Sequence, residues 1–139
     1  FRFEAGKAIS SNILSAMQAL YEQVEFSNQI PQNDTAFDAY LLVDYKKYHI
    51  RWGSTAFSQV NMNIYIDYEL LDKKKQRALM VSTDGSSSWR RKGGESVALI
   101  NPFISIMLTN SSLGEAWDQA LSNSIFNWVY ELQNHYQKK

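Results

Sequence analysis

The sequence contains no cysteine, carries no net charge and has no long apolar run. Without cysteine there is no disulfide, no thiolate metal ligand and no cysteine nucleophile. Fourteen basic residues balance fourteen acidic ones, so the chain lacks the strong positive field of a general nucleic-acid binder. No stretch approaches 18 consecutive apolar residues, so we expect no transmembrane helix.

What is present is typical of one globular domain over residues 1–139. Hydrophobic residues make up 45% of the chain and aromatic residues 14%, so much of the core should be Phe, Tyr and Trp. The chain begins with Phe1 rather than Met. We therefore interpret it as part of a longer precursor, with a signal peptide or lipid anchor upstream.

Apolar periodicity predicts the N-terminal half. Residues 1–3 alternate as a short strand would, and a helical pattern follows from Gly6 to about Val24. Residues 24–30 predict a strand, and residues 37–45 alternate as another. The apolar stripe of the predicted helix consists of Ile9, Ile13, Met17, Leu20, Tyr21 and Val24.

The clearest strand covers residues 60–70, where apolar and polar residues alternate strictly, and it is expected to have one wet face. Residues 72–76 form a polar turn, after which residues 79–83 alternate again, so the two strands should form a hairpin. The sequence Asp84-Gly85, followed by three serines, predicts the end of regular structure. Residues 89–94 read as a basic loop.

Helical signals return near the C-terminus. Pro102 fits the first position of a short helix, and Ser112 with Glu115 has the spacing of a capping box at a new helix start. A helical stripe of more than five turns then runs from Ala116 to Tyr136. No crossover helices separate the strands, so the sequence predicts an α+β fold with an antiparallel sheet of three to five strands, packed by an N-terminal helix and a long C-terminal helix.

Two helical stripes and one strand face should share a core. We expect these residues to be buried together: Ile13, Met17, Leu20, Ile64, Ile66, Leu121, Ile125 and Trp128.

No catalytic or metal-binding motif is present. The two histidines, His49 and His135, have no partner at metal-ligand spacing, so each reads as a surface residue. Asp67 and Glu69 share the polar face of the best strand, but solvated face residues show the same pattern. We predict no catalytic residue, no metal site and no cofactor, and hence a protein that is not an enzyme.

One charged cluster is a candidate for partner binding. Trp89, Arg90 and Arg91 combine apolar area with guanidinium donors, a composition enriched at interfaces, although a solvated loop is the alternative. Phe103, Ile104 and Met107 lie in a segment that either completes the core or forms an exposed patch for a protein or a membrane surface.

The arrangement as a whole resembles small bacterial envelope lipoproteins. The resemblance rests on residues 60–79, with Tyr68-Glu69-Leu70-Leu71-Asp72 before a charged turn, and on the helices either side. The families are the LPS-assembly lipoprotein, the auxiliary lipoproteins of ABC transport, and the lipoproteins of polysaccharide and curli secretion. Residues 73–75 are lysines where those turns usually carry glycine, and no functional residue can be carried over.

The resemblance implies an accessory role in a bacterial envelope transport, export or assembly system. It implies binding to other envelope proteins or to further copies of the chain. The apolar segment at residues 103–108 adds the membrane surface as an expected contact, and the balanced charge argues against nucleic acid as a partner. It also implies a periplasmic location, anchored to the outer membrane through a lipidated upstream segment. The alternative is a periplasmic domain that binds a small molecule or lipid between the sheet and the helices.

Overall fold

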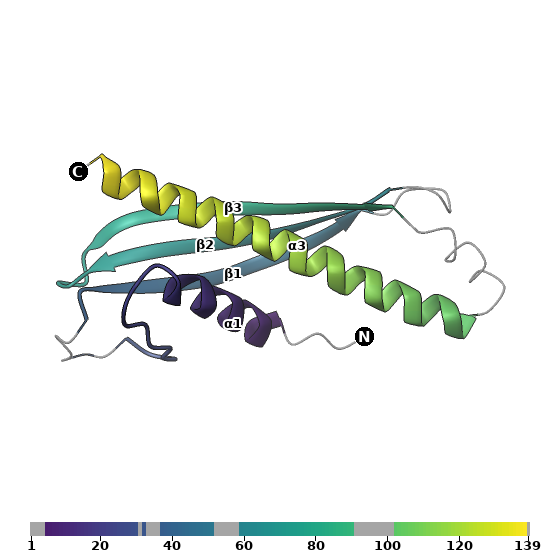
Figure 1. Ribbon diagram of the computed structural model, residues 1–139, viewed down its shortest axis with the longest axis horizontal. Coiled ribbons are helices and arrows are strands. Elements are labelled where there is room, and N and C mark those ends of the chain that lie inside the picture. The colour runs from purple at the N-terminus through teal and green to yellow at the C-terminus, as the bar shows by residue number, and fades with distance from the viewer. Residues whose placement is uncertain (1–4, 31, 33–36, 52–58, 91–101, 139) are drawn as a thin grey trace.

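The computed structural model describes residues 5–30, 32, 37–51, 59–90 and 102–138. Within them the elements are, in order, α1 (Ala5–Gln18), β1 (Ala39–Arg51), β2 (Gln59–Asp72), β3 (Arg77–Arg90) and α3 (Pro102–Gln137). The three strands form one antiparallel sheet in the order β1-β2-β3 (Figure 1). The predicted α+β class is therefore confirmed.

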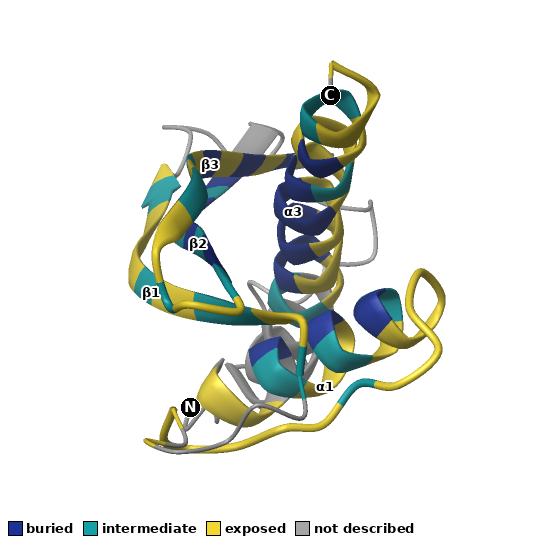
Figure 2. Cartoon of the chain, turned by 90° about the vertical axis from the view of Figure 1, so that its left-hand side faces the viewer, coloured by how far each residue is buried: buried dark blue, intermediate teal, exposed yellow. Residues whose placement is uncertain are grey.

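Both helices lie on the same side of the sheet. Figure 2 shows α3 and α1 to the right of the strands, with their buried residues turned towards one another and towards the sheet. In the described part of the chain no helix covers the opposite side, which we refer to as the helix-free face.

The alternation predicted for β2 is confirmed. Every second residue from Met62 to Leu70 is buried against the helices, and the residues between them are half-exposed on the helix-free face. The rings of Tyr68 and Trp128 stack in the middle of this core, with centroids 5.1 Å apart and planes within 6°. Burying two aromatic rings face to face ties the central strand to α3.

The predicted core is confirmed with one exception, Leu20. It is 41% exposed because α1 ends at Gln18, and a turn in which the amides of Leu20 and Tyr21 both donate to the Met17 carbonyl takes the chain off the helical stripe. The other seven residues belong to the core cluster: Ile13, Met17, Ile64, Ile66, Leu121, Ile125 and Trp128.

The end of regular structure predicted at Asp84 is wrong, because β3 continues to Arg90. The small residues there face α3 at close range: Thr83, Gly85 and Ser87 are buried beneath it. The Ser87 hydroxyl donates to the Ala116 carbonyl over 2.7 Å. Small side chains thus let helix and strand approach, rather than marking a loop.

Helix α3 also closes the outer edge of β3. The side-chain amide of Asn123 donates to the Ser86 carbonyl over 2.6 Å, and that of Asn127 donates to the Asp84 carbonyl over 3.4 Å. These bonds satisfy acceptors that an edge strand would otherwise present to another chain.

Strand β1 is longer than predicted, and a β-bulge at Lys46 explains why its pattern fades. The pairing with β2 passes from Tyr45 to Lys47, so Lys46 is an extra residue. Both Tyr45 and Tyr48 therefore face the helices, where their ring centroids lie 6.0 and 5.7 Å from that of Trp117. A one-residue insertion reverses the alternation, which hides a strand from a period-two search.

Two further predictions fail. Residues 24–30 form no strand, and Ser112 with Glu115 lies inside α3, which is continuous from Pro102 to Gln137. A Ser-x-x-Glu spacing can also occur within a helix, so it does not by itself mark a start. Pro102 does stand at the start of α3, as predicted. The strand predicted for residues 1–3 lies outside the described residues.

Candidate binding surface

Polar side chains form ladders across the helix-free face, because its residues on the three strands stand opposite one another. Three of these rows lie near the C-terminal ends of β1 and β3. They run Lys47–Tyr65–Asp84, His49–Asn63–Ser86 and Arg51–Asn61–Ser88. In each of these rows β1 contributes a basic or imidazole side chain, whereas β2 and β3 contribute mainly amides and hydroxyls.

A shallow polar groove of about 500 Å³ lies over these rows. Its lining comprises seven residues of the helix-free face, His49, Arg51, Asn61, Asn63, Tyr65, Ser86 and Ser88, together with Ser87 of β3 and Gln119 of α3 from the helix side. Apart from Ser87, whose buried hydroxyl bonds to the Ala116 carbonyl, these side chains can offer a hydrogen-bonding group, so the groove favours a polar partner over an apolar one.

Neighbouring side chains hold the amides of the groove in place. The Asn63 amide donates to the Asp84 carboxylate over 3.3 Å, and the Ser88 hydroxyl donates to the Asn61 side-chain oxygen over 3.0 Å. The Lys47 ammonium lies 5.3 Å from the centroid of the Tyr65 ring, within cation–π range. The groove therefore presents oriented donors and acceptors, with the Arg51 guanidinium at its β1 side and the Lys47 ammonium next to it.

The other half of the helix-free face carries ion pairs. The Lys46 ammonium contacts the Asp44 carboxylate and lies 3.4 Å from that of Asp67, and Arg77 pairs with Glu69. The Asp44 carboxylate, followed by that of Asp67, raises the pKa of Lys46. A hydrogen bond from Ser82, followed by the bond from Lys46, lowers the pKa of Asp67.

This arrangement suits surface ion pairing rather than acid–base chemistry. A lowered pKa keeps Asp67 ionised at neutral pH and makes it a weak proton acceptor, the opposite of what a general base requires. His49 stands opposite Asn63 on the strand ladder. No group of three or more His, Asp or Glu residues that could hold a metal ion occurs in the described ranges.

Two of the predicted partner residues, Trp89 and Arg90, lie at one end of the sheet. Trp89 and Arg90 stand in the last two positions of β3, opposite Val60 and Gln59, so the prediction that they lie on a loop is wrong. Arg91 and the side chains of Trp89 and Arg90 lie outside the described residues. Phe103, Ile104 and Met107 belong to the first turns of α3, and their side chains are likewise outside the described set.

Sequence reasoning missed the basic contribution of β1. It recognised the polar side of β2 but not that Lys47, His49 and Arg51 share the helix-free face, because the bulge interrupts the alternation just before them. Alternation counted separately from residue 47 onward would have placed these three on one face.

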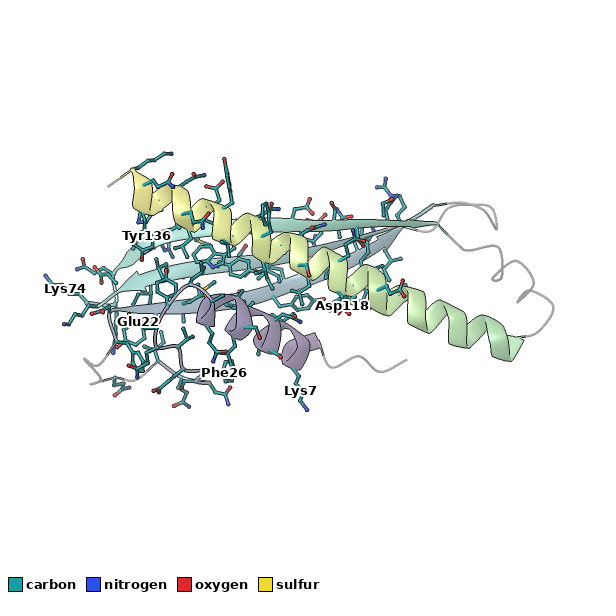
Figure 3. All side chains as sticks on the ribbon, in the orientation of Figure 1. Lys7, Glu22, Phe26, Lys74, Asp118 and Tyr136 are labelled. Carbon is teal, nitrogen blue, oxygen red and sulfur yellow. The ribbon has the colours of Figure 1, made fainter. Side chains whose placement is uncertain are left out.

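A second groove, mostly apolar and about 370 Å³ in volume, lies beside α1. It is lined by Gly6, Lys7, Ser10, Ser11, Leu14 and Phe26. Figure 3 shows Phe26 on the segment after α1, below the helix and on the same side as Lys7. Phe26 is 61% exposed, so this segment covers α1 only loosely.

None of the described helices is both long and apolar enough to span a bilayer.

No family model matches the chain, and no curated protein matches it. Its fold is similar to that of a protein from Caulobacter crescentus CB15, described as a proposed lipoprotein, whose crystal structure is known. The match covers 96% of this chain and 87% of that one, at 14% identity and a TM-score of 0.53, and it shows a shared fold.

Proposed function

We propose that this domain is a non-enzymatic accessory component of a bacterial envelope transport, export or assembly system, and that it acts by binding other proteins. The observation that carries the proposal is the helix-free face. Within the described residues one side of the sheet carries no helix, and its polar residues are arranged in ladders with basic side chains along β1. Such a face is stable in water and offers many fixed hydrogen-bonding groups to a partner.

The envelope part of the proposal comes from likeness. The Caulobacter crescentus CB15 protein with the similar fold is described as a proposed lipoprotein. We propose that this chain is likewise periplasmic and held at the outer membrane by an upstream lipidated segment.

We further propose that the partner surface extends from the groove to the end of β3. The pair Arg51–Asn61 and its neighbour Ser88 form the last full row of the groove, and Trp89 and Arg90 follow directly along β3. Figure 1 shows α3 starting at this same end of the molecule, so Phe103, Ile104 and Met107 would border the surface.

The test is site-specific photo-crosslinking in the native host. A photoreactive side chain at Asn61 should capture a discrete envelope protein, because this residue lies within the groove. The same group at Asp118, exposed on α3, is the matched control. In the variant with the photoreactive side chain at position 61, the further change Arg51→Glu should abolish the crosslink while leaving the melting temperature unchanged. Equal capture at both positions, or no effect of Arg51→Glu, would contradict the proposal.

The groove itself favours one second candidate, a small polar ligand. It is concave and lined by side chains with hydrogen-bonding groups. A small polar ligand that fits the groove would shift the NMR resonances of Asn61, Asn63 and Ser86 when it is added to the purified chain alone. An enzymatic function, by contrast, would require a hydrolase screen to find activity that Asp67→Asn or His49→Ala abolishes.

A further inference from the structure

The two edges of the sheet are treated differently by the rest of the chain. The outer edge of β3 is bonded by Asn123 and Asn127 of α3. The outer edge of β1 has no such cover: among the described residues, the backbone of residues 41–51 is hydrogen-bonded to β2 and to no other element. An exposed edge strand of this length is a template for pairing with another strand.

The bulge at Lys46 gives this edge an unusual symmetry. In an uninterrupted strand two residues three apart face opposite sides of the sheet. Here Asp44 and Lys47 share the helix-free face: Lys46 bridges Asp44 to Asp67, and Lys47 lies over Tyr65. Val43 and Tyr48, five apart, share the helix side in the same way.

Directly opposite residues of an antiparallel pair must face the same side. Consider two copies of β1 related by a two-fold axis that passes between Tyr45 and Lys46. Both copies carry the bulge at this axis, so the change of face is the same in each. From Asp44 towards the N-terminus of one copy, every residue then stands opposite a residue of the other copy that faces the same side. Asp44 then stands opposite Lys47, Val43 opposite Tyr48, Leu42 opposite His49, and Leu41 opposite Ile50. We infer that a second copy of this chain pairs antiparallel with β1 in this register, making a continuous six-stranded sheet.

Charge favours this partner. The Asp44 carboxylate of each copy stands opposite the Lys47 ammonium of the other, so two oppositely charged cross-strand pairs form about the axis. Opposite charges facing one another across strands are stabilising, and like charges are destabilising. The side chain of Asp44 is 66% exposed although it contacts Lys46, so it remains accessible to a second cation.

Apolar exposure, an independent observation, favours the same register. Val43 and Tyr48 are the large apolar side chains of β1 that remain exposed, at 36% and 55%. In the inferred register each covers the other across the two-fold axis, so the pairing removes from water the apolar surface that the monomer leaves uncovered.

Neighbouring registers lack these matches. A slip of two residues one way places Lys46 of one copy opposite Lys47 of the other, a like-charge pair beside the axis. A slip the other way places Asp44 opposite Tyr45 and Leu42 opposite Lys47. Lysines and bulges normally protect an edge strand from foreign strands. Here the lysine is matched by an aspartate of the same strand, so the protection does not extend to a second copy. The formal net charge of zero adds little repulsion between copies.

This inference goes beyond the proposed function, because it concerns a second copy of the chain at the backbone edge of β1, although Asp44 and Lys47 stand at the margin of the helix-free face. The test is sedimentation velocity of the purified chain over a wide range of concentrations. We expect a reversible monomer–dimer equilibrium that Asp44→Lys or Lys47→Asp weakens about tenfold, since each change replaces two attractive pairs with two repulsive ones. The double change Asp44→Lys with Lys47→Asp restores the dimer, and Asp118→Lys, the same charge change on α3, leaves it intact.

Register is tested separately with cysteine variants, since the chain has no cysteine of its own. A mixture of Asp44→Cys and Lys47→Cys chains should form the mixed disulfide faster than either chain links to itself. This readout holds even if a charge reversal disturbs folding, which circular dichroism would reveal. A chain that stays monomeric at every concentration, a double reversal that fails to restore the dimer, or equal rates of mixed and self-linking would each overturn the inference.

Discussion

Gly85 of β3 lies so close to Ala120 of α3 that a Cβ atom on Gly85 would come within 2.0 Å of the Ala120 carbonyl oxygen. The same atom would lie 2.7 Å from the Cβ of Ser124. Glycine at this position is therefore required by helix–strand packing, and the short side chains around it serve the same close approach.

Gly85→Ala should destabilise the domain by at least about 1–3 kcal/mol, because backbone atoms of α3 must move to accept one methyl group. The matched control is Gly114→Ala in α3, where a Cβ meets nothing within 4 Å. That change should stabilise the helix by about 0.5–1 kcal/mol. Urea unfolding of both variants measures the difference. Equal midpoints for the two variants would mean that α3 does not lie on β3 at this distance.

Core truncations should separate the buried positions from Leu20. Ile66→Ala and Leu121→Ala should each cost about 2–5 kcal/mol, since both side chains are almost fully buried in the core cluster. Leu20→Ala should cost far less, because Leu20 lies beyond the end of α1 and is exposed. Urea midpoints that rank Leu20 with the other two would show that α1 continues past Gln18.

Tyr68 should make the domain sensitive to alkali. Burial raises the pKa of Tyr68 above its ordinary value of 10.0, and this outweighs the hydrogen bonds to Ser124 and Thr83 that lower it. The unfolded chain therefore loses the phenol proton first, so stability is unaffected by this group below about pH 10 and falls as the pH rises above it.

Tyr68→Phe removes that titration. At neutral pH the variant should be less stable by about 0.5–1.5 kcal/mol, because it loses the 3.2 Å hydrogen bond to Ser124. Ser124 keeps its hydrogen bond with Thr83, so no buried hydroxyl is left unpaired. The unfolding free energies of parent and variant should converge above about pH 10. A gap that stays constant from neutral to alkaline pH would show that Tyr68 is not buried as described.

The elements that could be predicted from sequence are those in which the order of apolar and polar residues is set only by the burial of one face. Strand β2 alternates strictly because one face meets the helices and the other meets water, so its buried residues were predicted correctly. The stripe from Ala116 to Leu132 was equally clear, because α3 buries the same side along its length. The fold class follows from these two elements and the turn at residues 72–76.

The errors arise where tertiary packing sets the residue types. The run from Gly85 to Ser88 has the composition of a loop, yet Gly85 and Ser87 are small because α3 crosses them. In β1 the bulge at Lys46 reverses the alternation, and no local signal announces an inserted residue. Residues 24–30 have the apolar spacing of a strand, but no neighbouring strand pairs with them.

The candidate surface was only partly predictable for the same reason. Asn61, Asn63 and Tyr65 were expected on a wet face of β2, but the ladders also need the register of β1 and β3, which sequence alone does not give. Trp89 and Arg90 were chosen as loop residues and stand instead at the end of a strand. Their place in a partner surface therefore remains a proposal.

We propose that the helix-free face is the surface through which the domain works. Because the chain lacks cysteine, Asn63→Cys or Ser86→Cys places a single thiol on this face, and Asp118→Cys places one on α3 as the control, where Figure 3 labels Asp118. The measurement is the rate at which a membrane-permeant maleimide labels each thiol in the native host and in purified protein. We predict that residues 63 and 86 are labelled much more slowly in cells than when purified, whereas residue 118 reacts at the same rate in both. Equal rates in cells and in solution at all three positions would contradict the account.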